Sequence, residues 1–401
     1  MEKSKVKFFD ACNIYILLWV LGHVQQMFIN NSFISRVFYV PYLLMTIYYI
    51  FKVYVSYRPQ GTMKALCLFF AVLIVYGIAL LFLDNARGQA RTSFLIMLFG
   101  SLGPIFPFYF FTRERLLTEK RMMGWLWVFL VVAIVGFFVA QQKSLALAIE
   151  NGSRYEEITN NAAYSFAGLI PFVFLFKKKP LWQFLTLGLL FYFIISGFKR
   201  GAMLVGALML IWFVYASLKS SSKVMRLGIM ILTVVAIVVS YRFVTNLFEK
   251  SDYFQYRLES TIEGNSSERD EIYATLWHHY IYNDNILQLA FGEGAFHTEN
   301  VTGHVKAHND WLELLIDCGF FGVLLYVVYW VCFIVDWQKN KPNPLVYAML
   351  GSCFVFTFTR TFFSMSFSDL PFYTAMIMGY CFGVIQSATN CSEINIPIEY
   401  A

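Results

Sequence analysis

The stretch of the sequence most suited to chemistry runs from His308 to Gly322 and joins a polar segment to an apolar one. Asp310 and Glu313 have the D-x-x-E spacing of a capping box, which predicts a helix that begins there and runs to about Val335. His308 then precedes a helix N-terminus, whose positive end disfavours imidazolium and attracts anions. The pattern favours a neutral histidine that acts as a base beside a phosphate.

The polar segment that leads to this histidine covers residues 246–310. It holds eleven of the 25 acidic residues and five of the six histidines. Loops of this length are rarely without a function in compact proteins, so we expect the chemistry here. A helix is predicted from Ser267 to about Ile286, followed by a Phe-Gly-Glu-Gly turn at 291–294. The next candidate loop is 142–160.

The composition indicates the class of protein that positions these residues. The 401 residues are 58% hydrophobic and 19% aromatic but only 14% charged, and the mean hydropathy is +0.58. A water-soluble protein of this size cannot bury so much apolar surface. The sequence therefore predicts an all-α, polytopic integral membrane protein in contact with membrane lipid. The basic residues lie in short linkers between apolar runs, which argues against a nucleic-acid partner.

Apolar runs of about 20 residues predict about twelve transmembrane helices. They are expected near 9–29, 37–56, 63–83, 92–112, 122–141, 161–176, 181–196, 200–218, 226–245, 311–335, 344–363 and 369–387. The chain then divides into helices one to nine (1–245), a partly helical outer loop (246–310), and helices ten to twelve with a tail (311–401).

The distribution of positive charge predicts the orientation of these helices. With the N-terminus inside, 18 of the 31 Lys and Arg residues fall in inner segments and eight in the short outer segments. Cytoplasmic loops retain positive charge, so both termini are expected in the cytoplasm and the long loop outside.

Several strings, taken in order, resemble one known family. Residues His308, Asn309, Leu312, Leu315, Gly319 and Gly322 fill the pattern H-N-x-x-L-x-x-L-x-x-x-G-x-x-G without a gap. Ser267-Glu268-Arg269 with the turn at 291–294 is similar to an arginine-led loop helix and its G-x-G turn. The string from Ser196 to Ala202 is similar to an S-R-G/T-A helix start, with Phe198 and Lys199 inserted before Arg200. Together they resemble the bacterial O-antigen ligase superfamily, which also contains O-antigen and exopolysaccharide polymerases.

This resemblance implies an inverting, metal-independent glycosyltransferase without a cofactor, in the bacterial inner membrane. The donor would be an undecaprenyl-pyrophosphate-linked glycan, and the acceptor a sugar hydroxyl on the periplasmic side. Lipid A-core is the acceptor of a ligase, and another lipid-linked glycan that of a polymerase. His308 is expected to act on the acceptor hydroxyl, and Arg200 and Arg269 to bind the pyrophosphate. Asn309 and Arg360 are expected to support them.

Each of these assignments has a simpler alternative. His308 is then an ordinary interfacial residue, Arg269 pairs with neighbouring acids, and Arg200 and Arg360 are snorkelling anchors. A zinc site from His297, His304 and His308 is not expected, because no cysteine joins them. A lipid-linked glycan flippase is the main alternative of another class, although such transporters usually have paired repeats and polar residues near the bilayer midplane.

Overall fold

The computed structural model describes residues 10–29, 32–82, 91–150, 159–177, 179–262, 269–303 and 306–393, and it contains helices and turns but no strand in these ranges. This confirms the all-helical class. The helices are α1 (Ala11–Phe28), α2 (Ser32–Ser56), α3 (Gly61–Leu80), α4 (Ser93–Ser101), α5 (Ile105–Arg113), α6 (Glu119–Glu150), α7 (Ala163–Leu169), the 3-10 helix η1 (Ile170–Phe176), α8 (Pro180–Ser196), α9 (Arg200–Ser220), α10 (Lys223–Lys250), α11 (Asp252–Ile262), α12 (Arg269–Ile281), α13 (Ile286–Phe291), α14 (His297–Val301), α15 (Asp310–Lys339), α16 (Pro344–Arg360) and α17 (Phe372–Glu393).

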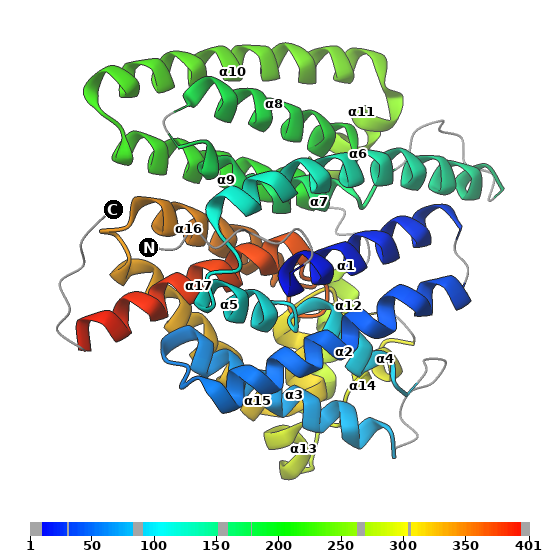
Figure 1. Cartoon of the computed structure of the whole chain (residues 1–401). Helices are drawn as coiled ribbons and strands as arrows, with labels where there is room; N and C mark the ends of the chain where they lie inside the picture. Colours follow the sequence, from blue (N-terminus) through cyan, green and yellow to red (C-terminus); the bar gives the residue numbers. More distant parts are fainter. Residues whose placement is uncertain are drawn as a thin grey trace.

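The long helices form a layered bundle (Figure 1). α8, α9 and α10 lie on one side, α2, α3 and α15 on the other, and α1, α5, α16 and α17 between them. α17 packs on α5, α15 on α3, and α16 on α9. The interior is an extended cluster of aliphatic and aromatic side chains. α10 has one buried residue, Ile229, so its apolar side chains face outward, as expected of a helix that contacts lipid.

Seven helical segments in the described residues are long and apolar enough to cross a membrane, judged by length and composition alone. They are α2, α3, α4 with α5, α6, α9, α10 and α15, and three shorter apolar segments (α7 with η1, α8 and α16) accompany them. α1 and α17 lie where the first and last spans are expected. The number twelve, and the three-part division of the chain, stay predictions.

One expected span is divided into two helices. Residues 92–112 form α4 and α5, separated by a turn that contains Gly103 and Pro104. Proline has no N–H to donate to the helix ladder, and its ring disfavours helical backbone in the residue before it. The apolar span expected at 92–112 is thus present as Ser93–Arg113, and the turn that divides it into two helices was not expected.

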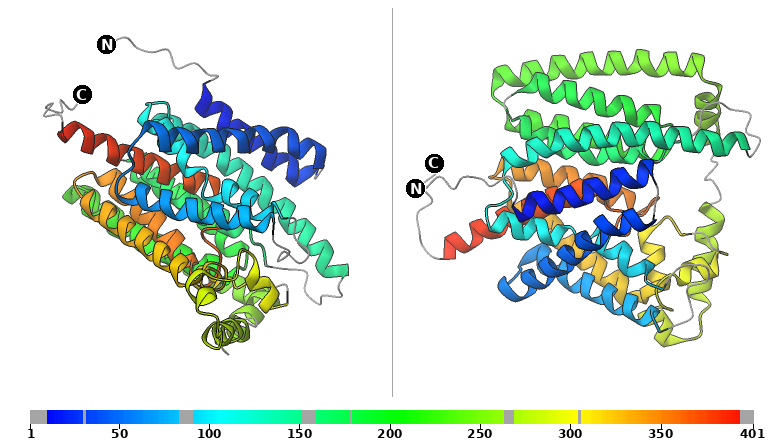
Figure 2. Two further views of the ribbon diagram at one scale, coloured as in Figure 1. Left: turned by 90° about the horizontal axis from the view of Figure 1, so that it is seen from below. Right: turned by 45° about the vertical axis from the view of Figure 1, so that its right-hand side comes forward.

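The long loop folds against the bundle as short helices. α12, α13 and α14 all contact α15, and they gather at the end of the bundle away from the last turns of α17 (Figure 2). The helix expected from Ser267 to about Ile286 is described as Arg269–Ile281, and 263–268 lie outside the described residues. A separate helix, α13, begins after Asn285, whose side chain accepts hydrogen bonds from the backbone N–H groups of Leu287 and Gln288.

α15 starts where expected but is not continuous. Gly319 has φ 64° and ψ −168° and breaks the helix. A Cβ at Gly319 would collide with the backbone of Gly292 and Ala290. The N–H groups of Glu293 and Gly294 donate to the carbonyls of Ile316 (2.9 Å) and Asp317 (3.0 Å). The glycine-rich turn is thus docked onto the break, which fixes the loop on the bundle.

Candidate functional site

A cavity of about 820 Å³ opens where the loop meets the bundle. Three of the five expected site residues line it: His308, Arg269 and Arg360. α1, α4, α7, α12, α16 and α17 contribute to its wall, together with the segments that precede α9 and α15 and the segment between α16 and α17. Arg200 and Asn309 are not among the lining residues. Residues from distant parts of the sequence therefore meet around one space.

The charged groups of this cavity, named here the cationic cavity, are mostly positive. Lys199, Arg269, Lys306 and Arg360 line it, against the single carboxylate of Asp369. Such a surface attracts anions, and it excludes bulk water in part, which strengthens the attraction. The arrangement is suited to a phosphate or pyrophosphate group.

His308 lies in the turn before α15 with φ 52°, in the left-handed region. That conformation costs about 1–2 kcal/mol for an L-residue, so neighbouring contacts must hold it. Tyr273 of α12 donates to the carbonyl of His308 (3.3 Å) and to that of Phe362 (3.2 Å). The N–H of Asp310 donates to the carbonyl of Thr361 (2.8 Å). The turn is thus fixed from two sides.

The electrostatic surroundings keep the imidazole of His308 neutral. Burial lowers the pKa of His308 below its ordinary value of 6.5, and the guanidinium of Arg269 lowers it further. The ammonium groups of Lys199 and Lys306 act in the same direction. A neutral imidazole has a ring nitrogen that accepts a proton or a hydrogen bond, so His308 is able to act as a base near pH 7.

Asn309 makes hydrogen bonds at the start of α15. Its Oδ1 accepts from the N–H groups of Trp311 (3.0 Å) and Leu312 (3.2 Å), and its Nδ2 donates to the carbonyl of Phe362 (3.2 Å). Asn309 is therefore the N-cap of α15, and the prediction of a capping box at Asp310 is wrong by one residue. An asparagine in this place starts the helix and directs the preceding histidine.

Asp310 instead anchors the segment between α16 and α17. Its buried carboxyl group accepts from the N–H groups of Ser366 (2.9 Å) and Phe367 (3.2 Å) and from the hydroxyl of Tyr326 (2.7 Å). Buried carboxyl groups need such partners. The contact was not expected, because it joins residues more than fifty positions apart.

Arg269 is the first residue of α12 and donates through Nη1 to the carbonyl of Phe363 (2.7 Å). This contact orients the guanidinium toward the segment that follows α16. Ser267 and Glu268, which precede it in the expected helix start, lie outside the described residues.

Arg200 is the first residue of α9, as expected for a helix start, but the neighbouring Lys199 is the residue that lines the cavity. Lys199 precedes the helix in extended backbone (φ −90°, ψ 103°), so its side chain leaves the chain in a different direction from that of Arg200. Lys199 was missed by the sequence analysis, and the inserted Phe198-Lys199 pair was the available signal.

Arg360 is fully buried and does not snorkel to the surface. Its Nη2 donates to the carbonyl of Met365 (2.8 Å) and to Asp369 Oδ2 (2.9 Å), and Nη1 donates to the carbonyl of Asp369 (3.0 Å). The guanidinium also lies over the ring of Tyr164, 4.9 Å from its centroid. Arg360 thus holds the segment that forms one wall of the cavity.

A second, mostly apolar cavity of about 310 Å³ adjoins the first. Trp19, His23, Ser165 and Tyr373 line both. The remaining lining comes mainly from apolar residues of α6. A charged space thus continues into an apolar one, which suits a molecule with an anionic head and a hydrocarbon part.

Part of the chain matches a known protein family. Residues 184–327 match the model of the family described as O-antigen ligase. No curated protein matches the chain, and no solved structure matches it. The matched range includes Lys199, Arg200, Arg269 and His308, and thus contains the expected motifs in their order. This match covers less than half of the chain and supports its relation to the O-antigen ligase-related superfamily.

Proposed function

We propose that the protein transfers a glycan from undecaprenyl pyrophosphate to a sugar hydroxyl, as an O-antigen ligase whose acceptor is lipid A-core. The observation that carries the proposal is the meeting of a neutral His308 with four cationic side chains in one cavity. Departure of the pyrophosphate develops negative charge, which preorganised cations stabilise.

The cationic cavity is proposed to bind the pyrophosphate of the donor. Arg269 offers a planar fork of donors that fits phosphate oxygens, and Lys199 offers a point charge. Arg200, which was expected in this role, does not line the cavity, and Lys199 is the better candidate from that segment. Arg360 is already engaged by Met365 and Asp369, so it is proposed to position the wall rather than to grip the donor.

The adjoining apolar cavity is proposed to accept the first part of the polyprenyl chain. It lies between α1, α6 and α17, which are apolar helices of the bundle. A lipid-linked donor requires an anionic and an apolar subsite in continuity, and the two cavities share four lining residues. A soluble nucleotide sugar would need no such apolar extension.

His308 is proposed to accept the proton of the attacking hydroxyl. The hydroxyl oxygen attacks the anomeric carbon, the bond from that carbon to the pyrophosphate breaks, and the proton passes to the imidazole. Direct displacement inverts the anomeric configuration and requires no metal ion. A polymerase would carry out the same steps with another lipid-linked glycan as acceptor.

The proposed location is the bacterial inner membrane, with both termini in the cytoplasm and the cavity open to the periplasm. α12 to α14 lie away from the last turns of α17, which accords with a loop and a C-terminus on opposite sides (Figure 2). Reporter fusions after Glu263 should then report the periplasm, and fusions after Lys179 the cytoplasm. The reverse pattern would contradict the proposed face.

The test is a transfer assay with purified full chain, lipid-linked glycan and each acceptor in turn. Removal of a general base lowers rate by about 100- to 10,000-fold, so His308→Ala should lose product to that extent. His278→Ala is the matched control, because this loop histidine does not line the cationic cavity. Product with lipid A-core alone identifies a ligase, and product with another lipid-linked glycan a polymerase. Movement of the donor across the membrane without a glycosidic product would contradict the proposal.

A further inference from the structure

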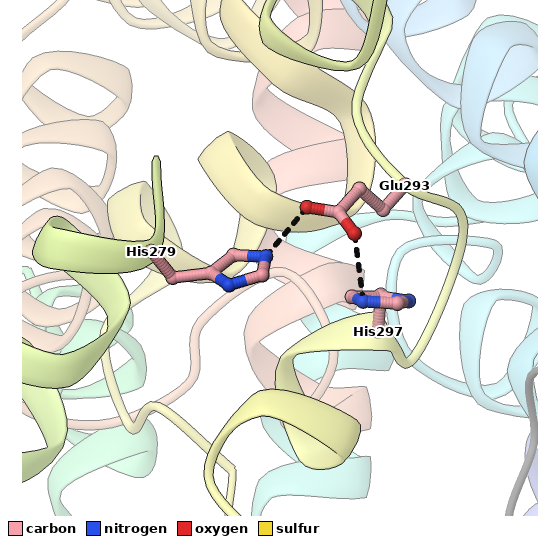
Figure 3. A group of neighbouring side chains, drawn as sticks. All are labelled: His279, Glu293 and His297. Carbon is pink, nitrogen blue, oxygen red and sulfur yellow. Dashed lines mark hydrogen bonds and ion pairs between the residues drawn. The ribbon is translucent and has the colours of Figure 1, made fainter. Parts of the chain in front are cut away.

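A second cluster of histidines lies in the loop, outside the cationic cavity. It consists of His279 of α12, Glu293 of the glycine-rich turn, and His297 of α14 (Figure 3). His279 Nε2 lies 2.6 Å from Glu293 Oε1, and His297 Nε2 lies 2.8 Å from Glu293 Oε2. Figure 3 shows both rings directed toward the carboxylate, each at a different oxygen. The three residues, named here the His-Glu-His cluster, were not combined in the sequence analysis.

From this geometry we propose that the His-Glu-His cluster binds one zinc ion. Its three ligand atoms lie within 4.8 Å of one another. Zinc takes imidazole nitrogen and carboxylate oxygen at about 2.0–2.2 Å, which places tetrahedral ligands about 3.3 Å apart. The ion would take the place of the two hydrogen bonds between the rings and the carboxylate. Two imidazoles and one carboxylate favour zinc over magnesium or calcium, which prefer oxygen ligands.

The surroundings leave the fourth coordination position open. An open depression, lined by Ala274, Thr275, His278, Asn300 and Val301 together with both histidines of the cluster, lies over it. The side chains of His279, His297 and Glu293 are 35%, 22% and 12% exposed. A water molecule therefore reaches the fourth position, and the ion is exchangeable.

Each ligand is carried by a different element of the loop, so a bound ion would hold these elements together. The N–H of Glu293 donates to the carbonyl of Ile316 beside the break in α15. His279 lies ten residues after Arg269 on α12, about 15 Å along the helix axis. An ion at the cluster therefore joins α12, the turn and α14, and it fixes the helix whose other end enters the cationic cavity. The zinc ion has a structural role in the loop and takes no part in the transfer step.

The test measures zinc binding to tag-free, metal-stripped full chain in detergent by titration calorimetry. The wild type should bind one zinc ion per chain, and the ion should raise the Tm. Loss of groups that only orient a ligand weakens metal binding by about 10- to 100-fold, so loss of a ligand should weaken it at least about 100-fold. His279→Ala, His297→Ala and Glu293→Gln should each do so.

Glu271→Gln is the matched control, because this exposed carboxylate of α12 lies outside the cluster and the depression over it, and it should bind zinc as the wild type does. Glu293→Gln keeps the shape of the side chain, and its Tm without metal shows whether the variant is folded. Wild type that takes up no stoichiometric zinc would overturn the proposal, as would a cluster variant with unchanged affinity. Because the measurement is binding alone, its failure leaves the proposed glycosyl transfer untouched, and failure of transfer leaves the zinc site untouched.

Discussion

The cationic cavity and the His-Glu-His cluster both present histidine at the same end of the bundle, yet the groups around the rings suit different partners. In the cavity, burial and the charges of Arg269, Lys199 and Lys306 lower the pKa of His308. In the cluster, a carboxylate lies between two rings. The first environment favours a neutral imidazole beside an anion, and the second favours a bound cation. The neighbours of a histidine, more than its sequence position, decide its chemistry.

Among the variants that compare the two regions, the largest effect is expected from removing one cation of the cavity, Arg269. Loss of one preorganised donor to a developing negative charge costs about 100- to 1,000-fold in rate. Arg269→Ala should therefore lower kcat/KM for the lipid-linked donor about 100-fold, and Arg269→Lys should lower it less. Arg242→Ala, on the outward-facing helix α10, is the matched control.

Steady-state transfer kinetics and zinc titration of the same Arg269→Ala preparation sharpen the comparison. Transfer should fall while zinc binding at the cluster stays as in the wild type. Unchanged transfer by Arg269→Ala would show that the cationic cavity does not stabilise the departing pyrophosphate.

A smaller effect is expected on the pH dependence of kcat/KM for transfer. His308 must be neutral to accept a proton, so activity is present above its pKa and is lost as the pH falls through it. Because that pKa lies below 6.5, the acidic limb of kcat/KM for the wild type should have its midpoint below pH 6.5. Arg269→Gln removes one lowering charge, which raises the pKa of His308 and moves the limb to higher pH.

The control for this profile is Glu293→Gln, which alters the cluster and leaves the charges around His308 in place. Its acidic limb should coincide with that of the wild type. A wild-type midpoint above pH 6.5, or a limb that Arg269→Gln leaves unmoved, would remove His308 from the role of base.

The smallest effect concerns the cap beside His308. Replacing an N-cap asparagine by alanine costs about 1 kcal/mol of stability, and Asn309→Ala should lower the free energy of unfolding by about that amount. Asn343→Ala removes the comparable cap of α16, where Oδ1 accepts from the N–H of Val346. Denaturation and transfer assays on both should give similar losses of stability, but a loss of kcat for Asn309→Ala alone. Equal activities would mean that the cap does not position His308.

Features set by local sequence were largely predictable. The apolar runs predicted where the helices lie, because burial in a bundle or bilayer depends on composition over about 20 residues. The start of α15 followed from a polar string before an apolar run, although the capping residue is Asn309 instead of Asp310. His308, Arg269 and Arg360 were all expected at a site, and they line one cavity.

Features set by contacts between distant residues were not predictable. The break at Gly319 depends on the close approach of Gly292 from the loop, and the local sequence of α15 does not show that Gly292 will lie there. Lys199 lines the cavity and Arg200 does not, and this depends on the extended backbone at the N-cap of α9, which the local sequence does not specify. The His-Glu-His cluster needs a helix, a turn and a second helix in register. The sequence analysis weighed His297 only with His304, which lies outside the described residues, and His308, which lines the other cavity, and it did not favour a zinc site there.

The most direct test of the central claim is a cryo-electron microscopy structure of the full chain in nanodiscs with bound undecaprenyl pyrophosphate. We expect the diphosphate in the cationic cavity, within hydrogen-bond distance of Arg269 and Lys199, with His308 beside it and the polyprenyl chain entering the apolar cavity along α6. A diphosphate bound elsewhere, or one separated from His308 by the wall of the cavity, would contradict it.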